Sequence, residues 1–266
     1  MKIIVCVKQV PDTSGKVAVN PDGTLNRASM ATITNPDDLN AVEAALVLKE
    51  QTGAEVVVVC MGPPPAEGML RECLARGCDR AVLVSGREFG GSDTYATSQI
   101  LAAAINKIGV DAEDIVMCGR QAIDGDTAQV GPQIAEKLGL PQISYAADIQ
   151  LDGNVVTVKR MLEDGYMTVK TQTPCLITCI KELNEPRYMS VYGIFDCYSK
   201  PYEVLDYNAL KDDPLIDPST IGLMGSPTNI LTSFTPPQKG AGMMLEGADK
   251  ATCDQLAGML AAKHMI

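Results

Sequence analysis

The sequence predicts an α/β fold in which an open, mainly parallel sheet carries helices on both faces. Continuous apolar runs, such as VVVVCM, alternate with longer stretches of helical periodicity through residues 1–140. Such runs are typical of strands that are buried on both faces, and strands alternating with helices form right-handed βαβ units. Ligands bind these sheets beyond the carboxyl ends of the strands, so the segments that follow the strands are the candidate sites.

The first half of the chain supplies these units in order. We expect strands at residues 2–7, 55–61, 80–84 and 115–118, and helices at 36–49, 66–75, 94–108 and 127–138. The first helix has the clearest start: Asn35 is placed to cap it, Pro36 suits its first position, and the aspartates that follow complement its dipole. Gly77 is expected to end the second helix in the left-handed conformation.

The pattern changes after Pro141. Segments 149–151 and 155–161 flank Asp152-Gly153-Asn154 and predict a hairpin, and further strands are expected at 166–170 and 176–180. These strands predict an antiparallel extension of the sheet or a small subdomain. The proline-rich stretch 213–238 predicts an extended arm, which is followed by an amphipathic helix at 248–263. We therefore divide the chain into a nucleotide-binding domain, 1–212, and an arm, 213–266, that contacts a partner.

Composition narrows the classes of function. With 266 residues the chain can bury a sizeable core, and its net charge of -11 argues against binding nucleic acid or an anionic membrane surface. No apolar run approaches the ~20 residues of a membrane span. The start, MKIIVCVKQV, leads directly into a strand and lacks the features of a signal peptide, so we expect a cytoplasmic protein.

Cysteine and histidine usage argues against metal and nucleophilic sites. The nine cysteines form no C-x-x-C pair, and most lie inside apolar runs, where a thiol behaves as a small hydrophobic group. The single histidine, His264, lies in the tail. We therefore expect no metal ligands and no catalytic side chains.

The loop GRQAIDGDTAQVGP, residues 119–132, is the strongest candidate site. A polar turn between a strand and a helix presents unpaired N–H groups at the positive end of the helix, which suits a phosphate. Asp126 and Gln129 fit a capping box, so a purely structural capped helix is the alternative. Because Asp124 and Asp126 would repel a phosphate, they are expected to point away from it while Arg120 faces it.

Other motifs are weaker. No G-x-G-x-x-G follows the first strand, and no G-x-x-x-x-G-K-[ST] is present. The stretch 90–93 resembles a pyrophosphatase loop in the wrong place, and Ser92 or Asp93 is better explained as a cap for the third helix. Arg160 and Arg187 face an anion or are surface charges. The apolar residues 191–195 are expected in an exposed loop, which is typical of a docking surface.

Five segments in order resemble the β subunit of electron transfer flavoproteins. They are IIVCVKQVPD, NPDDLNAVEAAL, VVVVCMGPP, GRQAIDGDTAQVGPQIAE, and VKRMLEDG with LNEPRY, and they cover nearly the whole chain. The resemblance implies a Rossmann-like, adenine-nucleotide-binding fold. It also implies a heterodimer with an α subunit that carries FAD and exchanges electrons with an acyl-CoA dehydrogenase or a quinone oxidoreductase.

The family has two branches, which differ in the cofactor of the β subunit. The ordinary branch holds AMP as a structural cofactor. The bifurcating branch holds a second FAD, which takes a hydride from NADH and divides the electrons between the α-subunit flavin and ferredoxin or flavodoxin. The motifs look closer to the bifurcating branch, so FAD is expected and AMP is the alternative. A nucleotide-sensing module of the universal-stress type, without a redox role, is the alternative from another class.

The resemblance also assigns site residues. It places Cys6 and Lys8 beside the adenosine, residues 35–38 and Asn40 along its wall, and the loop around the phosphates. Residues 191–200 become a partner-recognition segment, and the arm wraps the α subunit. The implied cofactor-binding residues are Cys6, Lys8, Asn35, Pro36, Asp37, Asp38, Asn40, Met61, Gly119, Arg120, Gln121, Ala122, Ile123, Asp124, Gly125, Asp126, Thr127, Ala128, Gln129 and Val130.

Overall fold

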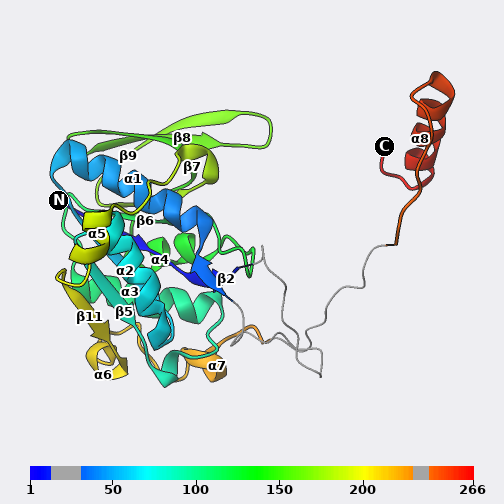
Figure 1. The fold of residues 1–266 in the computed structure, drawn as a ribbon. Helices are drawn as coiled ribbons and strands as arrows, with labels where there is room; N and C mark the ends of the chain where they lie inside the picture. Colours follow the sequence, from blue (N-terminus) through cyan, green and yellow to red (C-terminus); the bar gives the residue numbers. More distant parts are fainter. Residues whose placement is uncertain (13–30, 230–239) are drawn as a thin grey trace. The chain divides into compact units, whose positions relative to one another are not determined.

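The computed structural model describes residues 1–12, 31–229 and 240–266. The chain forms two compact units. The first comprises Met1–Ala18 and Leu25–Leu231 and contains the sheet with its helices (Figure 1). The second comprises Val19–Thr24 and Thr232–Ile266, and its described part contains one helix, α8 (Lys250–Ala262).

A nine-stranded sheet forms the centre of the first unit, in the order β11-β5-β4-β1-β6-β10-β7-β8-β9. The strands from β11 to β7 run parallel, and β8 and β9 continue the sheet antiparallel. The bounds are β1 Lys2–Cys6, β4 Glu55–Met61, β5 Arg80–Val84, β6 Ile115–Gly119, β7 Gln142–Asp152, β8 Val155–Met161, β9 Tyr166–Gln172, β10 Cys175–Cys179 and β11 Tyr202–Leu205. A separate ribbon pairs β2 (Gln9–Pro11) with β3 (Thr32–Thr34).

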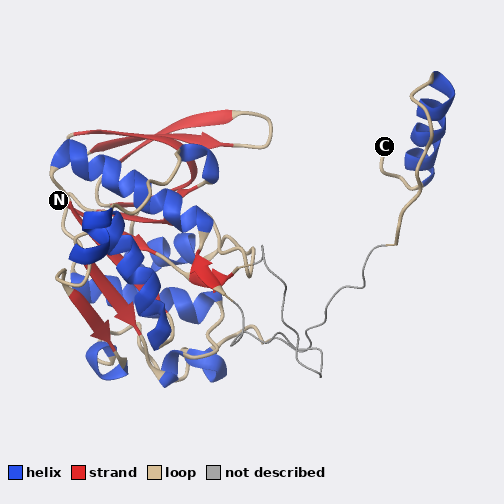
Figure 2. Ribbon diagram, viewed as in Figure 1, coloured by secondary structure: helices blue, strands red, loops and turns tan. Residues whose placement is uncertain are grey.

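Helices cover both faces of the sheet (Figure 2). Along β1, Ile3 and Val5 pack with α1 and α2, whereas Ile4 and Cys6 pack with α3 and α4. This double burial explains why the central strands are apolar at every position. The longer helices are α1 Pro36–Thr52, α2 Glu67–Arg76, α3 Thr94–Ile108 and α4 Val130–Leu138. The shorter helices are α5 Val191–Asp196, α6 Tyr207–Leu210 and α7 Gly222–Gly225. Three 3-10 turns are η2 Pro64–Ala66, η3 Arg87–Phe89 and η4 Lys181–Leu183.

The strand order creates a switch point beside β1. From β1 the chain moves outward through β4 and β5, then returns to place β6 on the other side of β1. At such a point the connections diverge to opposite faces and leave a crevice beyond the carboxyl ends of the two strands. The segments that follow β1 and β6 therefore lie side by side.

The predicted fold class is confirmed, and most elements lie where the sequence places them. Three predictions about the elements are wrong. The helix expected from residue 127 begins at Val130. The strand expected at 176–180 is β10, which lies parallel between β6 and β7 and is not part of an antiparallel extension. Gly77 has φ 128°, outside the left-handed helical region, although it does follow the last turn of α2.

The predicted arm differs from the structure in where it begins. Ile216 and Ile221 are buried in the core beside α3 and α6, so the segment after residue 213 packs on the first unit. Residues 230–239 of the predicted arm lie outside the described residues, as do residues 13–30. In α8, Asp249 caps the first turn by accepting from the Thr252 N–H at 2.9 Å. Among the described helices, none is long and apolar enough to cross a membrane.

Candidate functional site: the crevice beyond β1 and β6

Asp38 joins the three elements that meet at the switch point. Its carboxylate accepts the backbone N–H of Lys8, which follows β1, at 2.8 Å and that of Gly119, the last residue of β6, at 2.9 Å. A Cβ on Gly119 would lie 2.6 Å from the carbonyl carbon of Asp37, so only glycine allows this approach. The first turn of α1 therefore lies directly against the ends of both strands.

Asn35 holds the first half of the loop that follows β6. Its side-chain amide donates to the carbonyl of Gln121 at 2.8 Å, and its oxygen accepts the N–H of Ile123 at 3.1 Å. Asn35 stands at the N-cap of α1, as predicted, but its side chain makes no capping bond because the amide is used by the loop. Pro36 does occupy the first turn, as predicted.

The second half of the loop leaves free donors in front of α4. Asp126 and Ala128 adopt left-handed φ values of 50° and 52°, which non-glycine residues rarely adopt. Asp126 does not cap the helix, so the predicted capping box is wrong; Gln129 stands at the N-cap, and its side chain makes no capping bond. Within the described part of the chain, the N–H groups from Thr127 to Gly131 have no protein acceptor. Free amides at a helix N-terminus form an anion site.

Gly131 brings α4 close to the sheet. A Cβ at this position would lie 2.7 Å from Cys118 Sγ and 2.8 Å from Thr178 Cγ2. The glycine therefore lets the N-terminus of the helix approach the ends of β6 and β10. Close packing of this kind brings a ligand bound at the helix N-terminus within reach of residues at the strand ends.

Two ion pairs and one side-chain hydrogen bond engage charged side chains of the crevice. Lys8 Nζ lies 2.7 and 2.9 Å from the two carboxylate oxygens of Asp124. Arg120 Nε lies 3.3 Å from Asp37 Oδ2, an ion pair whose angle does not make a hydrogen bond. The Asp126 carboxylate accepts the side-chain amide of Gln121 at 2.7 Å. Arg120, which was expected to face a phosphate, is paired here with a carboxylate of the protein itself.

Burial controls the titration of this region. It raises the pKa of the Asp38 carboxyl to about 7, although the N–H groups of Lys8 and Gly119 act in the opposite direction. Burial also raises the pKa of Asp37, against the charge of Arg120. Burial likewise raises the pKa of the Cys6 thiol to about 12, so this thiol stays protonated near neutral pH. An activated thiolate nucleophile does not form at Cys6.

Most of the predicted site residues gather at the crevice. Cys6 and Lys8 lie at the end of β1, residues 35–38 lie against them, and residues 119–130 form the loop. Met61 ends the neighbouring strand β4. Asn40 differs, because its side chain bonds Asn184 at 2.7 and 3.0 Å and Asn184 donates back to the Asn40 carbonyl at 3.0 Å.

Thr94, which the sequence prediction missed, also reaches the loop. Its hydroxyl bonds the side-chain oxygen of Gln129 at 3.0 Å. The available signal was its position at the start of α3, directly after Asp93, which caps that helix as predicted by accepting from the Ala96 N–H at 3.0 Å. The N-termini of α1, α3 and α4 thus all contribute to the carboxyl edge of the sheet.

A second candidate surface, which we call the docking segment, covers residues 188–198. It contains the short helix α5, where an apolar loop was predicted. Its large side chains are exposed, with Tyr188 at 93% and Tyr192 and Phe195 each at 77%. Gly193 packs so tightly on the carbonyl of Ala75 that a side chain there would clash. Exposed aromatic residues on a firmly packed backbone are typical of protein interfaces.

Charged side chains fasten this segment to α1 and α2. The Arg187 guanidinium holds both carboxylate oxygens of Glu43, with a shortest distance of 2.9 Å, and reaches Glu50 at 2.6 Å. Arg76 donates to the Arg187 carbonyl, and Arg71 donates to that of Cys197 at 2.9 Å. Of the two alternatives left open for Arg187, a bound anion or a surface charge, the structure shows neither alone: Arg187 is paired with carboxylates of its own chain.

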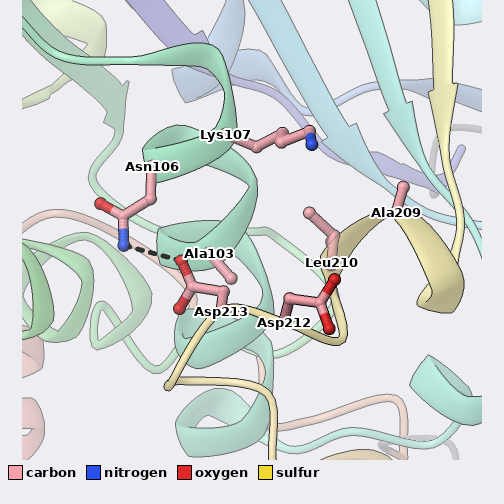
Figure 3. Close-up of a pocket in the computed structure, with 7 residues that line it drawn as sticks. All are labelled: Ala103, Asn106, Lys107, Ala209, Leu210, Asp212 and Asp213. Carbon is pink, nitrogen blue, oxygen red and sulfur yellow. Dashed lines mark hydrogen bonds between the residues drawn. The ribbon is translucent and has the colours of Figure 1, made fainter.

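Two cavities lie away from the crevice. One of about 250 Å³ lies between α3 and α6, where Asn106 donates to Asp213 at 3.0 Å (Figure 3). The other, of about 430 Å³, is lined by residues 139–141 and 171–174. Neither cavity is lined by the loops that follow β1 and β6, where basic side chains and free amides lie beside strand ends. We therefore place the candidate site at the crevice. Within the described ranges, no cluster of three or more His, Cys, Asp or Glu side chains is arranged to hold a metal.

Comparison with known proteins decides the family. A family model described as the electron transfer flavoprotein domain matches residues 22–204. The chain belongs to the electron transfer flavoprotein family. It is 49% identical, over 100% of both chains, to an electron transfer flavoprotein subunit beta of Clostridium acetobutylicum. This similarity confirms the β-subunit family that the sequence motifs indicate.

Two further relatives of this family are named as parts of reductase systems. The chain is 67% identical, over 100% of both chains, to the acryloyl-CoA reductase electron transfer subunit gamma of Anaerotignum propionicum. It is 51% identical to the caffeyl-CoA reductase-Etf complex subunit CarD of Acetobacterium woodii, over 99% of this chain and 97% of that one.

Proposed function

We propose that the chain is the β subunit of a heterodimeric electron transfer flavoprotein and that its crevice binds FAD. The observation that carries the proposal is the run of free N–H groups from Thr127 to Gly131 at the switch point of an electron transfer flavoprotein fold. Amides at a helix N-terminus favour phosphate oxygens, and the switch point is where open α/β sheets bind nucleotides.

The residues of the crevice suit the phosphates and ribose of an adenine nucleotide. The N–H groups of residues 127–131 donate to phosphate oxygens, and Lys8 and Arg120 supply positive charge. Asn35 and Asp38 hold the two loops in register, which keeps the donors in place before the ligand arrives. The hydroxyl of Thr94 and the amide of Gln129 offer neutral polar contacts.

FAD, when bound, supplies hydride acceptance from NADH and single-electron transfer, and the protein binds, orients and tunes it. The residues of this chain need no nucleophile for that role, which agrees with the protonated state of the Cys6 thiol. Cytoplasmic location and bifurcation, in which electrons also reach ferredoxin or flavodoxin, belong to the same proposal. The amino-acid sequences of the family motifs support the bifurcating branch.

The proposed partners are an α subunit that carries FAD and a dehydrogenase or reductase of acyl-CoA compounds. The names of the relatives from Anaerotignum propionicum and Acetobacterium woodii support this substrate class. We assign the dehydrogenase contact to the docking segment because its aromatic side chains are exposed. The second unit, with α8, is assigned to the α subunit.

AMP is the second candidate for the crevice. It shares the adenosine and first phosphate of FAD, so the same amides and the same Lys8 suit both ligands. The ordinary branch of the family holds it as a structural cofactor. Family membership favours either of these over a nucleotide sensor without a redox role.

The cofactor content of the purified αβ complex tests the proposal. Acid release followed by chromatography should yield one FAD for each subunit and no AMP, and anaerobic NADH should bleach both flavins. A single FAD accompanied by AMP, with no reduction by NADH, would replace the bifurcating assignment with the ordinary one. Release of neither nucleotide from this subunit would remove the function assigned to the crevice.

A further inference from the structure

The Lys8–Asp124 pair bridges the two loops that line the crevice. Lys8 extends from the end of β1 and Asp124 from the loop after β6, so the pair joins the two walls of the crevice. Lys8 is 49% exposed and Asp124 23% exposed, so water and ligands reach the ammonium group. An accessible pair of this kind is held weakly and can exchange partners.

A carboxylate and a phosphate compete for the same ammonium donors. Each presents anionic oxygens that accept charge-assisted hydrogen bonds of similar length. The phosphate has additional donors in the crevice, because the N–H groups from Thr127 to Gly131 have no acceptor among the described residues and Asp124 accepts from none of them. Two anions beside one ammonium repel each other, so binding of a phosphate favours release of the carboxylate.

The other acidic side chain of the loop has a different partner. Asp126 accepts from the neutral amide of Gln121 at 2.7 Å and contacts no cation within the described residues. The loop therefore contains two aspartates of equal charge. Of the two, Asp124 is the one that forms an ion pair with Lys8. This contrast separates a specific exchange of partners from a general effect of negative charge.

We propose that Asp124 is an internal anion that occupies Lys8 until a nucleotide phosphate displaces it. Lys8 then changes its partner from the carboxylate to a phosphate oxygen, and Asp124 turns to solvent. The exchange lowers affinity for the phosphate and leaves affinity for the nucleoside unchanged. Asp124 thereby determines how strongly the crevice prefers phosphorylated ligands. This inference rests on the proposed nucleotide function and specifies how that site is regulated.

Calorimetric titration of the αβ complex, freed of its nucleotide, tests the exchange with AMP and adenosine as probes. The variant Asp124→Asn should bind AMP about fivefold more tightly than the wild type, the range expected for release of an exposed ion pair. Its affinity for adenosine should not change. The matched variant Asp126→Asn, with the same loss of charge, should tighten AMP less than twofold. The gain in Asp124→Asn should shrink as salt is raised.

A second background isolates the pair itself. In a Lys8→Gln complex, adding Asp124→Asn should no longer tighten AMP, because the cation for which the two anions compete is absent. Far-UV circular dichroism confirms that each variant is folded. Equal tightening by Asp124→Asn and Asp126→Asn, or weaker AMP binding by Asp124→Asn, overturns the proposal. If adenosine and AMP bind to none of the complexes, the proposed nucleotide function fails together with it.

Discussion

Asp38 combines two roles at the scale of single residues. Its carboxylate joins the ends of β1 and β6, and it does so from a buried position. A buried carboxyl accepts two backbone N–H groups best when ionised, yet burial disfavours the charge and raises its pKa to about 7. The geometry of the crevice and the pH of the solution are thus linked through one group.

Stability should depend on pH through Asp38. The pKa is about 7 in the folded chain and about 4 in the unfolded chain, so the folded state binds this proton more tightly. The resulting contribution to the free energy of unfolding is fully present below about pH 4 and is lost as the pH rises through 7. The free energy of unfolding of the wild type, minus that of Asp38→Asn, should therefore fall between about pH 5 and pH 8 in urea titrations. A difference that stays constant or rises contradicts the assignment.

At single residues, local sequence patterns predict a role poorly where the side chain bonds outside the capping pattern. Asn35 and Asp126 both fit local capping patterns, and local patterns are all that spacing reveals. In the folded chain, Asn35 bonds a loop 86 residues away, and Asp126 bonds Gln121. Pro36 and Asp93 were assigned correctly because their roles depend on adjacent residues.

At the scale of elements, periodicity predicts whether a segment is a strand or a helix better than it predicts where that element lies in the fold. The strands and helices of the first half were predicted because buried parallel strands are continuously apolar and the helices carry clear start and stop residues. β10 was recognised as a strand, but its place between β6 and β7 depends on pairing across more than one crossover. The short α5 was missed because its exposed apolar residues have no helical pattern.

The docking segment depends on Arg187 for its position. Burial raises the pKa of Glu43, but hydrogen bonds from Arg187 outweigh it and leave the carboxylate ionised and paired. The variant Arg187→Lys cannot hold Glu43 with two nitrogens and reach Glu50 as well. We expect its KM for the acyl-CoA reductase or dehydrogenase partner to rise roughly tenfold, with kcat little changed.

The matched control is Arg87→Lys, because Arg87 is exposed and has no ion pair within the described residues. NADH-dependent reduction of a small dye, which needs no docking partner, should be similar in both variants. If Arg187→Lys lowers dye reduction and partner turnover equally, the residue acts on folding or on the nucleotide site and does not position the docking segment.

At the scale of the whole molecule, one helix spans both surfaces. The first turn of α1 holds the crevice through Asp38. Its later turns hold the residues that lead into the docking segment, because Asn40 bonds Asn184 and Glu43 bonds Arg187. The fold class follows from the alternation of strands and helices, and the family follows from motifs spread along the chain. The fold and the crevice do not separate FAD from AMP, because both ligands use the same phosphate donors; the motifs are what favour FAD.

Hydrogen exchange of the αβ complex, measured with its nucleotide and after nucleotide removal, tests the central claim most directly. The account predicts slower exchange with nucleotide in peptides that cover residues 120–131, because the free N–H groups of Thr127 to Gly131 become donors to phosphate. Peptides that line the cavity between α3 and α6 should not change. Protection at that cavity, with no change in residues 120–131, would contradict a nucleotide site at the crevice.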